Sequence, residues 1–247
     1  MRSAWRRRVA TLVLTGAAGV FALAGAATAA AAGGGASGGP VPPGTPAFIQ
    51  RSLQAVAHSR AYVTGETVDM DLGFVKEVSV IKGYWIHRGS VLENYQVMDN
   101  TVTDHTGTHR VLTFAYQDPH RVCTRASAQA RWRCTPQQTQ ALMQKFLPFV
   151  RVSHVRVLPP RVVGGQRALG AVLTIQMDMA GVAAAGGAPP GASAALGGAD
   201  TITATYWISA ATFLPITMTI SGLLSSQATT VSYSDWNSPS VVIPHIP

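Results

Sequence analysis

The pattern of apolar and polar positions in the C-terminal third of the chain is that of β-strands. Apolar residues recur at every second position in three segments, residues 166–179, 202–209 and 213–221. Because successive side chains of a strand point to opposite faces, each segment offers one apolar face and one mostly polar face. We call the apolar positions of these segments the apolar stripe: Leu173, Ile175, Met177, Met179, Ile202, Tyr206, Ile208, Leu214, Ile216, Met218 and Ile220.

Two interpretations of the apolar stripe are open. It can be an ordinary core that packs under helices, or it can line a cavity for an apolar ligand. Methionine side chains adapt to apolar partners of varied shape, and Met177, Met179 and Met218 all belong to the stripe. Periodicity by itself favours the ordinary core. A bulky substitution separates the two, because overpacking a tight core costs about 1–3 kcal/mol of stability.

The other periodic segments predict further strands and two helices. One helix is expected at residues 46–58 and a second at residues 135–149, with Thr135 as its N-terminal cap. Strands are expected at residues 61–70, 77–87, 92–102, 110–117, 155–158 and 229–234, with a hairpin or loop at 122–134. Strands and helices do not alternate along the chain. This order predicts an α+β fold, an antiparallel sheet with helices against one face.

The N-terminal part of the chain has the composition of an export signal followed by a linker. Residues 1–32 place four arginines before an uncharged apolar run that ends in small residues, which is the order of a secretory signal peptide. A retained anchor is the alternative, because spanning a bilayer needs about 20 apolar residues. Residues 33–45 form a Gly/Pro-rich linker, and residues 46–247 are predicted to form a single domain. Within that domain, the Ala/Gly-rich residues 180–199 predict a flexible loop.

Much of the positive charge belongs to the export signal. The formal net charge is +8, and it falls to +4 without the four arginines of residues 1–8. Arg121, Arg125, Arg131 and Arg133 gather around the cysteines. Such a patch can attract phosphate, but a solvated hairpin explains it more simply. We therefore predict no nucleic-acid partner.

The two cysteines, Cys123 and Cys134, are predicted to form a disulfide. An exported chain enters an oxidising compartment, where disulfides form and persist. A structural zinc site needs more ligands: His120 is nearby, but the sequence has no second pair of ligands at metal-binding spacing. No metal and no cofactor are therefore expected.

No sequence motif nominates a catalytic centre. Residues 104–109 (DHTGTH) carry two histidines at four-residue spacing, but the glycine between them indicates a polar turn. Asp69 and Asp71 are paired acids for which the sequence suggests no partner. A nucleophile elbow, a phosphate-binding glycine loop and a C-x-x-C motif are all missing from the sequence. The chain is not expected to be an enzyme, although the members of a catalytic triad can be dispersed in a sequence.

Three aromatic motifs stand near the C-terminus. They are Tyr-Trp-Ile at residues 206–208, Phe-Leu-Pro-Ile at 213–216 and Tyr-Ser-Asp-Trp-Asn at 233–237. Together they resemble the C-terminal part of the LolA/LppX-type family of exported bacterial lipoprotein and lipid carriers. The similarity is best over roughly the last 45 residues and extends loosely to residues 62–66 and to Tyr84-Trp85. Ser209 and Phe213 depart from the family pattern, which commonly has an acidic residue and a glycine at these positions.

The resemblance implies an incomplete antiparallel β-barrel, a curved sheet with helices packed on its concave face. The implied function is an exported periplasmic or cell-envelope binding protein that shields a lipid, an acyl chain or a lipoprotein in a half-barrel cavity lined by the apolar stripe. The sequence lacks the lipid-attachment cysteine of membrane-anchored relatives, which favours a soluble or secreted protein. The alternative is an envelope sensor or regulatory module that acts through contacts with an envelope protein or the membrane surface.

Overall fold

The computed structural model describes residues 45–71, 76–89, 91–137, 149–178, 181, 199–222 and 228–246. The signal peptide predicted at residues 1–32 lies outside these residues. So do almost all of the predicted linker at 33–45 and most of the loop predicted at 180–199. None of the described helices is long and apolar enough to cross a membrane.

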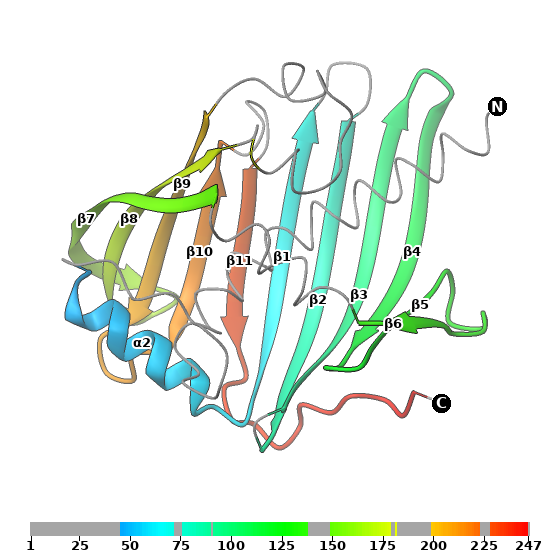
Figure 1. Cartoon of the computed structure of the whole chain (residues 1–247), viewed down its shortest axis with the longest axis horizontal. Coiled ribbons are helices and arrows are strands. Elements are labelled where there is room, and N and C mark those ends of the chain that lie inside the picture. Colours follow the sequence, from blue (N-terminus) through cyan, green and yellow to red (C-terminus); the bar gives the residue numbers. More distant parts are fainter. Residues whose placement is uncertain are drawn as a thin grey trace.

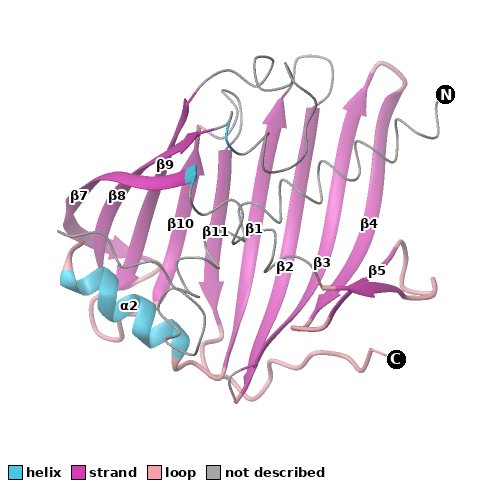
Figure 2. Ribbon diagram, viewed as in Figure 1, coloured by secondary structure: helices cyan, strands magenta, loops and turns pink. Residues whose placement is uncertain are grey.

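Eleven strands form one antiparallel sheet that curves and stays open (Figures 1 and 2). The strand order is β6-β5-β4-β3-β2-β1-β11-β10-β9-β8-β7, so the first strand pairs with the last in the middle of the sheet. The strands are β1 (Ala61–Asp71), β2 (Lys76–Arg88), β3 (Val91–Asp104), β4 (Gly107–Gln117), β5 (Arg121–Arg125), β6 (Arg133–Pro136), β7 (Val150–Val163), β8 (Gln166–Asp178), β9 (Ala199–Ser209), β10 (Pro215–Ser221) and β11 (Ala228–Ser234).

The helix predicted at residues 46–58 is confirmed as α2 (Ala47–Ala57). Its apolar face buries Ile49 and Leu53, which pack against Ala171 of β8 and Ile208 of β9. An amphipathic helix gains most of its stability from such packing rather than from its intrinsic propensity. We call the face of the sheet that α2 contacts the helix face.

The prediction of a second helix at residues 135–149 is wrong at its N-terminal end. Thr135 and Pro136 belong to β6, where they pair with Val122 and Arg121 of β5. The reason is the preceding half of the hairpin: Cys123 lies directly opposite Cys134, so the ladder carries on through the next residues. Residues 138–148 lie outside the described residues.

The several helices expected on the concave face are not found among the described residues. α2 is the one helix described in full, and its apolar contacts fall at the β7–β9 end of the sheet (Figure 2). The described part of the chain is therefore mostly β rather than an even mixture of helix and sheet.

Two of the differences from the predicted strand bounds have a cause in proline or in backbone conformation. The strand expected at residues 155–158 extends over all of β7, and the ladder shifts register between Leu158 and Arg161, across two prolines. Proline is tolerated there because β7 lies at an edge of the sheet. β10 starts at Pro215 rather than at Phe213, whose φ of 58° takes it out of the strand conformation. That φ accounts for the glycine that the resembled family commonly has at this position.

The opposite side of the sheet, which we call the tail face, is covered in part by the C-terminal segment, residues 238–246. Val241 packs with Ala61 and Val63 of β1. Ile243 and Ile246 join a cluster that includes Phe114 and Cys123. In Figure 1 this segment runs past the lower ends of β2 and β3. A segment without helix or strand thus supplies part of the core.

Asn237 fixes the start of the C-terminal segment through two hydrogen bonds. Its backbone N–H donates to the carbonyl of Ala61 (2.7 Å), and its Oδ1 accepts from the backbone N–H of Arg60 (2.6 Å). Asn237 adopts a φ of 58°, a left-handed conformation that asparagine tolerates better than most residues. At the far end, Arg121 donates through Nη2 to the carbonyl of Ile246 (3.2 Å).

The predicted disulfide between Cys123 and Cys134 is confirmed. It joins β5 to β6, and Cys123 is fully buried against the tail-face cluster. Next to it, the Arg125 guanidinium lies over the rings of Phe114 (4.7 Å) and Trp132 (4.6 Å). Arg125, part of the basic group noted in the sequence, is therefore engaged in aromatic packing.

Removing this disulfide should destabilise the protein measurably. The bridge closes a loop with a sequence separation of 11, for which chain-entropy models give roughly 3 kcal/mol. We expect urea unfolding to show that the Cys123→Ala/Cys134→Ala variant has a free energy of unfolding lower by that amount. We also expect thiol titration of the unfolded, unreduced wild type to find no free thiol. Two free thiols in protein recovered from an oxidising compartment would contradict this prediction.

Candidate functional site

The strand pairing brings much of the apolar stripe together on the helix face. Residues directly opposite each other on neighbouring strands share a face of the sheet. Ile175 of β8 lies opposite Ile202 of β9, and Tyr206 of β9 lies opposite Met218 of β10. Ile220 pairs with Ala204 and completes the same face. These residues of the three strands therefore share one face of the sheet.

The apolar stripe divides into two clusters. Ile208 and Tyr206 lie under α2, where Tyr206 OH is 3.4 Å from Ser52 Oγ. The second cluster, here called the apolar layer, contains Ile175, Ile202, Ala204, Met218, Ile220 and Val231, with Val152, Leu173, Tyr206 and Tyr233 packed against it. Every one of these residues belongs to β7–β11. Among the described residues, the layer is therefore built only from the half of the sheet formed by β7–β11.

Four members of the predicted stripe are not placed in either cluster. Leu214 lies in the turn before β10, and Ile216 has no partner on β9 because the ladder shifts register between Pro215 and Thr217. Met177 continues β8 opposite Asp200, and its side chain is not described. Met179 lies outside the described residues.

An aromatic cluster that sequence analysis did not nominate lies beside the apolar layer. The Tyr62 ring stacks on Trp236 (centroids 4.6 Å apart) and on Trp85 (5.7 Å), and Tyr233 stacks on Trp236 (6.0 Å). Both indole N–H groups are satisfied: Trp85 donates to Thr64 Oγ1 and Trp236 to the Pro215 carbonyl, each at 3.1 Å. The sequence signal was present in the aromatic motifs, but only the pairing of β1 with β11 joins them.

A buried acid interrupts this face. Glu66 of β1 is 2% exposed, and neither of its carboxylate oxygens has a hydrogen-bond partner in the described part of the chain. It lies directly between Ile81 of β2 and Val231 of β11, which belongs to the apolar layer. Burial among such neighbours disfavours the charged form and raises the pKa of Glu66 to about 8. Glu66 therefore carries a proton at neutral pH.

A second acid on the same face is better satisfied. Glu77 of β2 is buried, and one of its oxygens accepts from Ser79 Oγ at 2.9 Å. Burial raises the pKa of Glu77, and the hydrogen bond from Ser79 partly opposes that rise. Glu77 lies opposite Met70, four residues along β1 from Glu66, so the two acids are separate features of the helix face.

The tyrosines of the helix face are uncharged over the physiological range. Burial raises the pKa of Tyr206 to about 12, against a lowering by the hydrogen bond with Ser52. Burial also raises the pKa values of Tyr62 and Tyr233, and the charge of Glu66, when present, adds to the rise at Tyr233. Tyr206, Tyr62 and Tyr233 therefore add no charge next to the apolar layer at neutral pH.

Neither a metal centre nor a catalytic cluster stands out among the described residues. No group of three or more histidine, cysteine, aspartate or glutamate side chains there could hold a metal ion. Residues 104–109 form the β3–β4 turn, as predicted: Asp104 Oδ1 accepts from the Thr106 backbone N–H at 2.7 Å and from its hydroxyl. Asp69 and Asp71 are exposed residues near the end of β1.

No protein-family model matches the sequence, and no curated protein does. Solved structures similar to this chain include LprF from Mycobacterium bovis (14% identity, TM-score 0.49), covering 80% of this chain and 94% of that one. Lipoprotein LppX from Mycobacterium tuberculosis is similar at 15% identity and a TM-score of 0.45, covering 79% and 97%. The MucA/MucB complex of Pseudomonas aeruginosa is similar at 11% identity and a TM-score of 0.39, covering 79% of this chain and 57% of the matching chain.

At these identities and TM-scores, the similar structures are no evidence for what this chain binds. The apolar layer, the aromatic cluster and Glu66 have to be interpreted from their own chemistry. LppX is a member of the family that the C-terminal motifs resemble.

Proposed function

We propose that this chain is an exported binding protein that shields an apolar ligand, such as a lipid, an acyl chain or a lipoprotein, on the helix face of β8–β11. The observation that carries the proposal is the apolar layer, whose six core members are buried (0–8% exposed) and whose described members all come from β7–β11. α2 packs at the neighbouring position, over Ile208, and contributes no residue to the apolar layer. An acyl chain is a fitting partner for that layer.

The energetics of such a complex follow from the chemistry of the layer. Burying apolar surface contributes roughly 25 cal/mol per Å², so an acyl chain laid on aliphatic side chains gains affinity with each methylene. The methionine at position 218 can adapt its shape to chains of different outline. The neutral tyrosines around the layer add no charge that would have to be desolvated.

Export is part of the proposal. It is supported by the order of basic, apolar and small residues within residues 1–32 and by the Cys123–Cys134 disulfide. A carrier of apolar molecules is useful outside the cytoplasm, where a lipid has to cross an aqueous space. The same argument favours a ligand that is poorly soluble in water.

A tryptophan at position 218 tests the proposal. If the layer binds ligand, Met218→Trp should weaken binding of a fluorescent fatty-acid probe by about tenfold or more, because the larger side chain fills ligand space. The free energy of unfolding should change by less than about 1 kcal/mol, whereas overpacking a tight core costs about 1–3 kcal/mol. Met218 is preferred to Ile208, which packs against α2.

The control is Val80→Trp, since Val80 is 53% exposed on β2. This variant should bind the probe as the wild type does. Failure of the wild type to bind any lipid probe would refute the proposal and leave protein contacts as the function. Large destabilisation by Met218→Trp would show that the apolar layer is an ordinary core.

A further inference from the structure

The buried acid Glu66 has no structural task that the described residues reveal. A buried polar group ordinarily finds a hydrogen-bond partner, and leaving it without one costs stability. Both carboxylate oxygens of Glu66 are buried and lack a partner in the described part of the chain, although serine, threonine and tyrosine side chains lie on the same face. An aliphatic residue at this position would pack against Ile81 and Val231 without that cost.

The position of Glu66 links it to the apolar layer. Its direct neighbour on β11, Val231, is a member of the layer, and adjacent strands lie about 4.8 Å apart. Met218 lies opposite Val231 on the next strand, so an apolar chain resting on Met218 and Val231 would reach Glu66. The acid therefore marks a border of the apolar layer.

We propose that Glu66 recognises the head group of the ligand: its carboxyl group exchanges hydrogen bonds with the hydroxyl of an uncharged, hydroxyl-bearing lipid whose chain lies on the apolar layer. This inference rests on the proposed function and gives it a substrate class. A protonated carboxyl group offers one O–H donor and an acceptor oxygen, which matches the donor and acceptor of an alcohol.

Charged head groups fit this position less well. Glu66 is flanked by Ile81 and Val231, and no lysine, arginine or histidine side chain of the described residues pairs with it. An anionic head would meet a carboxyl group with no cation to compensate it. Burial raises the pKa of the carboxyl group to about 8, so a cationic head group would have to drive its deprotonation at neutral pH, whereas a hydroxyl binds the protonated form directly.

Two ligands that differ by one hydroxyl test the inference. 1-Octadecanol and octadecane have the same saturated chain of 18 carbons. Each is used to displace a bound fluorescent probe, and each affinity is corrected for the solubility of the competitor in water. We expect the wild type to prefer the alcohol by about tenfold, the value of a satisfied buried hydrogen bond. Glu66→Leu should lose this preference, and Glu66→Gln, which keeps a donor and an acceptor, should retain part of it.

Glu93→Leu is the matched control. Glu93 lies on β3 and forms an ion pair with the exposed Arg88 (3.0 Å), so its replacement should leave the preference unchanged. If Glu66→Leu binds both ligands and still prefers the alcohol, the inference is wrong and the proposed function stands. The inference is also wrong if the wild type binds the probe but binds the alcohol and the hydrocarbon no more tightly than Glu66→Leu does. If the wild type does not bind the probe, the proposed function fails and the inference fails with it.

Discussion

Replacing Glu66 with glutamine should raise the free energy of unfolding by about 5 kcal/mol at pH 9 and leave it nearly unchanged at pH 4. The cause is the rise in the pKa of Glu66 from 4.5 to about 8 on folding, at about 1.4 kcal/mol per unit. Glutamine has nearly the shape of the protonated acid and cannot ionise. The difference in the free energy of unfolding between the two proteins at each pH therefore measures the cost of ionising the buried carboxyl group.

The direction of the pH dependence follows from proton binding in the two states. Between about pH 4.5 and pH 8 the unfolded chain has released the Glu66 proton while the folded protein still holds it. Raising the pH therefore favours unfolding across this window, and the loss levels off above the folded pKa. The pKa of Glu77 is raised as well, but it acts in both proteins and cancels in the comparison.

Urea unfolding of both proteins at pH 4, 6, 7.5 and 9 measures this effect. The two curves of stability against pH should diverge progressively above about pH 5. Glu93→Gln serves as the control, because Glu93 is ion-paired with Arg88 and its loss should lower stability by less than about 1 kcal/mol. Parallel curves for the wild type and Glu66→Gln would show that Glu66 is solvated or partnered.

Alanine at both Ile243 and Ile246 should lower the free energy of unfolding by about 4 kcal/mol. Both side chains are buried in the tail-face cluster with Phe114, Tyr116 and Cys123. A single buried isoleucine replaced by alanine typically costs 2–5 kcal/mol, and fraying near the chain end reduces the sum of the two. Loss of the segment also removes the hydrogen bond from Arg121 to the Ile246 carbonyl.

Val242 provides the control within the same segment. It lies next to Ile243 but is 65% exposed, so Val242→Ala should change the stability by no more than about 0.5 kcal/mol. Thermal unfolding with circular dichroism detects both effects. If the Ile243→Ala/Ile246→Ala variant is as stable as Val242→Ala, the C-terminal segment does not contribute to the core in solution.

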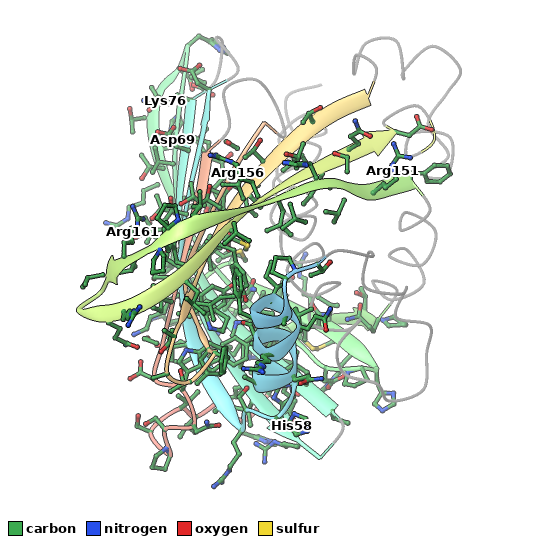
Figure 3. The ribbon with its side chains drawn as sticks, turned by 90° about the vertical axis from the view of Figure 1, so that its left-hand side faces the viewer. His58, Asp69, Lys76, Arg151, Arg156 and Arg161 are labelled. Carbon is green, nitrogen blue, oxygen red and sulfur yellow. A yellow bond between two sulfur atoms is a disulfide. The ribbon has the colours of Figure 1, made fainter. Side chains whose placement is uncertain are left out.

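These two predictions concern opposite faces of one sheet. The C-terminal segment covers part of the tail face through aliphatic and aromatic contacts. The helix face carries the apolar layer, the aromatic cluster and Glu66. Trp207 of β9 lies on the face opposite to Ile208, where the guanidinium of Arg161, labelled in Figure 3, lies over its ring (3.9 Å).

Several elements could be predicted because their signals are local. α2, the strands β8 and β9 and the turn at residues 104–109 follow from the spacing of side chains a few residues apart. The disulfide needed only two cysteines and an oxidising compartment. The apolar stripe was placed on one face for the same reason, because a period of two is imposed by the backbone of a strand.

What lies opposite a given residue was decided by tertiary structure alone. Thr135 carried the signal of a helix cap, yet the pairing of Cys123 with Cys134 drew it into β6. The C-terminal segment has no periodicity, and its isoleucines became core only because they meet the tail face. Glu66 shows the same limit most clearly: β1 places it between β2 and β11, and β11 begins more than 150 residues later in the chain. Local spacing determines which side a residue faces, but its burial depends on distant segments, and the cost of an unpartnered carboxyl exists only after they have packed.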